Sequence, residues 1–326
     1  MLGFLNRKKE NEGMVGVCLA DHGIALAHTS RSHEGAPHLN QCELINVDSD
    51  KQRSSAFVTR VSDLGLNQTH CSFVLSNSDY NLLLVEAPKV EANEMASAIR
   101  WRIKDLLDRP LDEVATDVFP VPDDAYRNQG EMLYVVAARK SRIVEIVDLI
   151  ESSGLILDAI DIPELALRNL SSMYTDDSNG LAFMDLRPTG STLNLCKNGS
   201  IYLTRHLSTQ VDADVMSSNE WESVRERLVL EIQRSLDYYE SQMGQNPISR
   251  LLIAPRSKDS HALAKQLNEA MGVSVETMDL AARLDTKLEL PADKQQSCLL
   301  AIGGSLRQEG HPARKERVEA EEEVEQ

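Results

Sequence analysis

The stretch that decides the fold is residues 181–207, LAFMDLRPTGSTLNLCKNGSIYLTRHL. It opens with a short apolar run that contains Asp185, and residues 187–190 (RPTG) then form a turn signal. A second run alternates apolar and polar residues up to Asn198 and Gly199, and a third begins at Ile201. Asn-Gly between two alternating runs is a strong hairpin signal. The sequence therefore predicts a three-stranded antiparallel meander with a carboxylate at its first turn.

Taken alone, this pattern is explained most simply by an ordinary sheet in which Asp185 caps a turn. A weaker copy of the pattern lies near the N-terminus, where residues 15–19, 24–28 and 39–47 form three runs. Two meanders, one opening each half of the chain, indicate a duplicated architecture. We expect the two meanders to face each other across a cleft.

Composition and charge exclude several classes of protein. The chain has 326 residues, which is room for two domains, and a formal net charge of −17. Such a charge argues against nucleic acid as a partner, because phosphate binding needs a basic face. Five scattered cysteines form no C-x-x-C pair, which argues against structural zinc and favours a reducing compartment. No signal peptide and no apolar run of about 20 residues is present, so we expect a soluble, cytoplasmic protein without a transmembrane segment.

Strands and helices alternate in both halves, which is typical of an α/β protein. The clearest amphipathic helices are predicted over residues 91–107 and 219–243, and an apolar helix over residues 298–306 contains Gly303 and Gly304. The sequence contains no P-loop, G-x-S-x-G or dinucleotide fingerprint, so it offers no candidate catalytic residues and no metal site.

Four blocks of sequence resemble the PilM-type family of pilus assembly proteins, and they occur in the family's order. They are residues 98–101 (AIRW) with 110–114 (PLDEV) and Asp117, residues 135–140 (VVAARK), residues 230–239 (LEIQRSLDYY) and residues 301–306 (AIGGSL). Within the family, the short loops and altered turns look most like the members that serve the mannose-sensitive haemagglutinin (MSHA) pilus.

The resemblance implies an actin-like α/β fold related to FtsA, with two lobes, an extra subdomain and a central cleft. The polar, turn-rich residues 175–180 and the acidic run at the end divide the chain into a flexible arm (residues 1–12), a first lobe (13–175), a second lobe (176–307) and a disordered acidic tail (308–326). The resemblance places the extra subdomain within the first lobe, at about residues 79–157. It further implies a cytoplasmic adaptor, peripheral to the inner membrane, in a type IV pilus assembly platform.

An actin-like cleft makes chemical demands that the sequence can be tested against. Two tight turns must let backbone N–H groups approach the phosphates, and carboxylates must hold magnesium through water. In the family, the first turn has the pattern D-x-G-S-S and a later lysine. The aligned positions here hold Cys18, Ala20, Asp21, His22 and Ala25. The metal-side carboxylate, the glycine, both serines and the lysine are therefore all replaced.

The other two nucleotide motifs are also altered. The second turn keeps Asp185, but Arg187 replaces its glycine, and Pro255 and Arg256 replace the double glycine on the adenosine side. The residues that could still line a nucleotide site are Asp21, Asp185, Arg187, Thr189, Glu231, Arg234, Gly303 and Gly304. Two hypotheses follow: an adaptor without cofactor or enzymatic activity, and a working actin-like ATPase that binds ATP and magnesium. The three altered motifs favour the adaptor.

The resemblance also implies a partner and its groove. The partner would be the cytoplasmic tail of a PilN-like membrane protein, MshJ-like in the MSHA system, together with other components of the pilus platform. In the family the groove lies between the extra subdomain and the first lobe, which points to Val85, Ile99, Trp101 and Leu106. For Ile99 and Leu106 the alternative is that they belong to the core of the subdomain.

Overall fold

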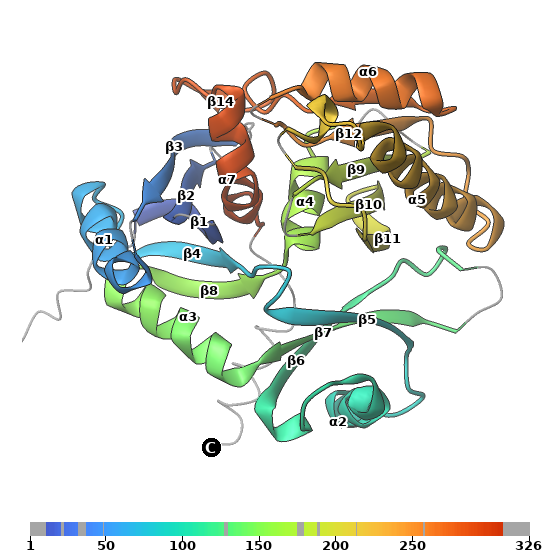
Figure 1. The fold of residues 1–326 in the computed structure, drawn as a ribbon. Coiled ribbons are helices and arrows are strands. Elements are labelled where there is room, and N and C mark those ends of the chain that lie inside the picture. The colour runs from blue at the N-terminus through green and yellow to red at the C-terminus, as the bar shows by residue number, and fades with distance from the viewer. Residues whose placement is uncertain are drawn as a thin grey trace, which may run out of the picture.

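Three β-sheets organise the chain in the computed structural model (Figure 1). The structure describes residues 11–20, 23–31, 37–47, 49–126, 130–174, 179–187, 190–212, 214–256 and 258–308. Residues 1–10 of the predicted arm lie outside the described residues. The predicted acidic tail also lies outside them from residue 309 onward.

The first sheet has six strands in the order β14-β3-β2-β1-β4-β8. Their bounds are β1 (Asn11–Ala20), β2 (Gly23–Ser30), β3 (His38–Asn46), β4 (Thr69–Val74), β8 (Ile156–Asp161) and β14 (Asp285–Thr286). The first three strands form the predicted N-terminal meander, and β4 and β8 continue the sheet in parallel from β1. The short β14 comes from the far end of the chain and pairs with β3.

The second sheet contains the predicted central meander. Its order is β11-β10-β9-β12-β13, with β9 (Leu181–Asp185), β10 (Ser191–Lys197), β11 (Ser200–Leu207), β12 (Arg250–Ile253) and β13 (Ser274–Thr277). Asn198 and Gly199 have φ angles of 51° and 74°, and the residues that flank them pair directly. Both central residues of a type I′ turn need positive φ, so the Asn-Gly hairpin is confirmed.

A third, smaller sheet lies below the two large ones (Figure 1). It has the order β5-β7-β6, with β5 (Tyr80–Glu86), β6 (Val114–Pro120) and β7 (Met132–Arg139). Helix α2 (Ala92–Ile103) packs on one face of this sheet through an apolar cluster that includes Val85, Ile99 and Ile103. The small sheet and α2 lie within the segment predicted as the extra subdomain, whereas β8, at the end of that segment, pairs within the first sheet.

Helices fill the space around the two large sheets. α1 (Asp50–Asp63) and α3 (Lys140–Ser153) pack together beside the first sheet, while α5 (Trp221–Ser241) and α6 (Ser260–Ala270) pack together beside the second. α4 (Pro163–Ser171) and α7 (Ala292–Ser305) contact each other between the two sheets (Figure 1). One apolar core therefore runs through both lobes.

The two faces of the first sheet differ in the size of their side chains. The face toward α1 and α3 carries large residues such as Val15 and Ile24, whereas Gly16, Cys18 and Ala25 point toward α7. A Cβ atom on Gly16 would lie 1.9 Å from the backbone oxygen of Ala301, so α7 approaches this face too closely for any side chain there. The small residues at these positions are therefore explained by helix packing.

Candidate functional site

A cleft of about 530 Å³ separates the two lobes, and strand ends from both meanders line it. From the second lobe, Asp185 lies at the end of β9, and its carboxylate Oδ2 accepts a hydrogen bond of 2.6 Å from Nε of Arg187. Asp185 is almost fully buried, and the guanidinium neutralises its charge. The carboxylate that could have held a hydrated metal ion is thus already paired with a cation of the same chain.

The wall of the cleft on the first lobe contains both apolar and polar residues. Leu19, Leu44 and Leu75 line it, and Leu300 of α7 adds to this surface. Cys18, at the position of the family's metal-side carboxylate, is buried against α7, and burial raises the pKa of its thiol to about 12. The group is therefore a neutral thiol at physiological pH and offers no charge to a metal ion.

Arg256 lies where the family has its adenosine-side glycines, and its side chain is almost fully buried. Its guanidinium donates to the backbone oxygens of Leu186 (3.3 Å), Val211 (3.1 Å) and Asp212 (3.0 Å). Burial lowers its pKa, although nearby carboxylates oppose this shift. The arginine ties the segment after β9 to the loop after β11.

Of the other predicted nucleotide-site residues, those that the structure describes do not line this cleft. Glu231 on α5 accepts hydrogen bonds from the backbone N–H groups of Ser208 and Thr209, and Arg234 is exposed on the same helix. Gly303 and Gly304 are buried in α7, where Gly303 faces the backbone of α4 and Gly304 faces Val74 and Gly16. Asp21 and Thr189 lie outside the described residues. Of the predicted set, the cleft brings together Asp185 and Arg187.

The four predicted partner-binding residues divide into two environments. Val85 and Ile99 are buried between α2 and the small sheet. Trp101 and Leu106 are 66% and 57% exposed on the outer surface, where Nζ of Lys104 lies 5.2 Å from the centroid of the Trp101 ring. For Ile99 the core alternative therefore describes its position, whereas Leu106 lies outside the core.

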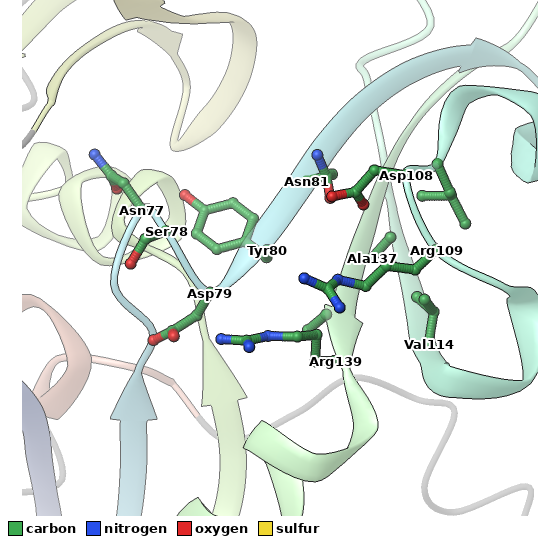
Figure 2. A pocket seen from close by; sticks show the side chains of 12 residues that line it. Asn77, Ser78, Asp79, Tyr80, Asn81, Asp108, Arg109, Val114, Ala137 and Arg139 are labelled. Atoms are coloured by element: carbon green, nitrogen blue, oxygen red, sulfur yellow. The ribbon is translucent and has the colours of Figure 1, made fainter.

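A different cavity lies where the small sheet meets the first lobe (Figure 2). This junction pocket has a volume of about 380 Å³ and is lined by residues 77–81, 107–109, 114 and 137–139. Val114 and Ala137, which belong to the buried apolar cluster between α2 and the small sheet, also line it. The side chain of Arg109 reaches from its loop over the centre of the pocket, and that of Arg139 extends from the end of β7 (Figure 2).

In the junction pocket, the buried carboxylate has partners, whereas two of the arginines form no ion pair with a described residue. Oδ1 of Asp79 lies 3.2 Å from Nε of Arg142, and its Oδ2 accepts a hydrogen bond of 3.1 Å from the N–H of Ser76. Arg109 and Arg139 form no ion pair with any described carboxylate, and the side chain of Asp108 is exposed beside them. Two guanidinium groups are therefore available to a ligand that carries carbonyl or carboxylate oxygens.

Neither Arg109 nor Arg139 is among the site residues that the sequence predicted. They lie thirty positions apart in the chain, and only the pairing of β5, β6 and β7 brings their segments to one end of the small sheet. The available signal was the family block at residues 135–140, which contains Arg139.

A buried carboxylate joins the small sheet to both lobes next to this pocket. Glu164, in the first turn of α4, has no exposed surface and accepts hydrogen bonds from the hydroxyl of Tyr80 (2.7 Å) and from Nε2 of His206 (2.6 Å). Tyr80 begins β5 and His206 lies in β11, so three separate elements meet at one side chain. The hydrogen bond to Glu164 raises the pKa of His206.

This contact predicts a specific pH dependence of stability. Because the pKa of His206 is higher in the folded state, its stabilising contribution is complete below the unfolded pKa of about 6.5 and is lost as the pH rises through the folded pKa. His206→Gln should therefore lower the free energy of unfolding most at mildly acidic pH. Denaturant unfolding across this range measures the effect, with His261→Gln on the exposed side of α6 as the control. A loss for His206→Gln that does not change with pH would contradict the prediction.

Two α/β lobes, each opened by an antiparallel meander and joined through α4 and α7 around a cleft, define an actin-like fold. The comparison with solved structures confirms this class. One match is a protein with an actin-like ATPase fold from Bacteroides thetaiotaomicron, at a TM-score of 0.50 and 9% identity, covering 91% of this chain and 99% of that chain.

A stronger similarity is to the PilM-PilN type IV pilus biogenesis complex. The TM-score is 0.69 at 19% identity, and the match covers 92% of this chain and 99% of that chain. The cytoplasmic domain of EpsL, an inner membrane component of the type II secretion system of Vibrio cholerae, matches at a TM-score of 0.51 and 11% identity, over 92% and 97% of the two chains. The sequence itself matches no protein-family model and no curated protein at a significant level.

Two searches of the described residues found nothing. None of the helices there is both long and apolar enough to cross a bilayer. In the same part of the chain, no three His, Cys, Asp or Glu side chains are grouped as ligands for a metal ion.

Proposed function

We propose that this protein is an adaptor of a type IV pilus assembly platform, of the MshI kind that serves the MSHA pilus. It would act on the cytoplasmic face of the inner membrane and bind the tail of a PilN-like or MshJ-like membrane protein. The observation that carries the proposal is the fold similarity to the PilM-PilN complex over almost the whole of both chains. The four sequence blocks of the PilM-type family support the same assignment.

The junction pocket is the binding site that we propose for this tail. It lies between the small sheet and the first lobe, which is where the family resemblance implies a groove. Its accessible lining is mostly polar, and Arg109 and Arg139 can donate to oxygens of an extended peptide. Hydrogen bonds to the main chain are a common source of affinity for such a peptide.

Binding of the tail peptide tests this proposal. A synthetic peptide of the tail should bind the full chain, and Arg109→Ala or Arg139→Ala should each weaken binding about tenfold, since a hydrogen bond from a charged donor contributes about 1.5–3 kcal/mol. Fluorescence anisotropy measures the dissociation constants. Arg234→Ala, which removes an exposed arginine on α5, is the matched control and should have no effect.

The same assay separates the junction pocket from the outer surface of α2. If Trp101→Ala weakens binding and the two arginine variants do not, the tail binds on the surface that carries Trp101 and Leu106. A folded wild-type chain that fails to retain the peptide would remove the main support for an adaptor.

We infer that the cleft does not bind Mg-ATP and that the protein is not an ATPase. Three features support this inference: the pairing of Asp185 with Arg187, the buried thiol of Cys18, and the hydrogen bonds that hold Arg256 at the adenosine side. A ligand that binds only the native state raises the melting temperature. Because we expect no binding, saturating Mg-ATP should leave the melting temperature of this protein unchanged. Phosphate release that is abolished by Asp185→Ala would instead identify a working ATPase.

A further inference from the structure

The two arginines of the junction pocket form no ion pair with a described carboxylate, although the chain has a net charge of −17. Asp79, the buried carboxylate of the pocket, is occupied by Arg142 and the N–H of Ser76. Asp108 is exposed at the rim, and within the described part of the chain no ion pair joins it to Arg109. A carboxylate from elsewhere could therefore form charge-assisted hydrogen bonds with Arg109 and Arg139 together.

The same chain carries a strongly acidic segment beyond the described residues. Residues 319–325 have the sequence EAEEEVE, in which five of the seven side chains are carboxylates. The basic residues near it, Arg314, Lys315 and Arg317, all precede this run. Charge complementarity therefore matches residues 319–325, rather than the part just before them, to the arginine pair.

The described chain leads toward the corner of the molecule where the junction pocket lies. Nη1 of Arg307 lies 2.8 Å from Oδ2 of Asp161, at the end of β8. The backbone oxygen of Asp161 accepts a hydrogen bond of 2.9 Å from Leu75, and residues 77–81, which line the pocket, follow directly. From residue 308, the chain up to residue 319 can span ~35 Å when extended, at about 3.3–3.6 Å per residue. The linking segment can therefore carry residues 319–325 to any point within ~35 Å of the end of the described chain.

We propose that the acidic segment, residues 319–325, docks on Arg109 and Arg139 and competes with the partner's tail for the junction pocket. Taking the pocket as the partner's site rests on the proposed function, whereas the contact within the chain does not. The segment belongs to the same chain as the pocket, so its effective concentration is high and a weak contact is enough to occupy the site. The partner would bind by displacing it, and salt would weaken the competition because the contact is ionic.

Chemical modification of arginine tests the contact without any partner. The full chain is treated with phenylglyoxal at low salt, and mass spectrometry follows the modification of Arg109, Arg139 and the exposed Arg234. In a variant with Glu319, Glu321, Glu322, Glu323 and Glu325 all replaced by Gln, we expect Arg109 and Arg139 to react several-fold faster than in the wild type. Arg234 should react at the same rate in both chains, and high salt should remove the difference. Equal rates for Arg109 and Arg139 in the two chains at low salt would overturn the proposal.

A second readout keeps this inference separate from the proposed function. If the glutamine variant also binds the partner's tail peptide several-fold more tightly, the segment and the tail share the pocket. Protected arginines in a chain that binds no tail peptide would support the contact and count against the proposed function. Unprotected arginines in a chain that does bind the peptide would overturn the contact alone.

Discussion

Replacing Gly16 with alanine is expected to lower the free energy of unfolding by about 3 kcal/mol, which is at the upper end of the usual cost of overpacking a core. The added Cβ would lie 1.9 Å from the backbone oxygen of Ala301 and 2.4 Å from the backbone nitrogen of Ser305. Both atoms belong to α7 and cannot rotate away, so the helix itself must move. Gly303→Ala should act similarly at the next interface, because its Cβ would lie 2.4 Å from the oxygen of Ala166 in α4.

Denaturant unfolding of the two variants measures these losses, with Gly272→Ala as the control. Gly272 is exposed, and no atom lies within 4 Å of the position that an added Cβ would take, so its replacement should change stability by less than about 0.5 kcal/mol. If Gly16→Ala behaves like this control, α7 does not pack against β1 as described.

Arg256→Ala is expected to cost about 3 kcal/mol of stability. The substitution removes three hydrogen bonds and leaves the buried backbone oxygens of Leu186 and Val211 without their donor. Unfolding in denaturant gives the loss, and Arg234→Ala is the control for removing an arginine from an exposed site. Arg256→Ala should not create Mg-ATP binding, because the Asp185–Arg187 pair remains. A variant as stable as the control would show that Arg256 does not hold the two loops together.

The fold could be predicted because its signals are local or come in a fixed order. The hairpin at Asn198 and Gly199 needs two residues with positive φ, and the sequence supplies both beside two alternating runs. The two lobes and the cleft followed from the repeated meander and from the order of the four family blocks.

The site was harder to predict because it depends on which face of an element a residue occupies. Ile99 and Ile103 are four positions apart and share the buried face of α2, whereas Trp101 lies two positions from each and points outward. Helical spacing alone could therefore have separated Trp101 from Ile99. The junction pocket could not have been found in this way, because Arg109 and Arg139 meet only through the strand pairing of the small sheet.

The return of α7 and β14 to the first sheet has a consequence for synthesis of the protein. A ribosome releases β1, β2 and β3 first, and their small-residue face has no cover until residues 292–305 emerge. The rest of the second lobe, up to residue 291, is translated in the interval. Since domains generally fold in the order in which they are made, the first lobe of this protein must wait as an incomplete intermediate with an exposed apolar face. We therefore expect chaperones to bind a nascent chain that is arrested before α7 has emerged.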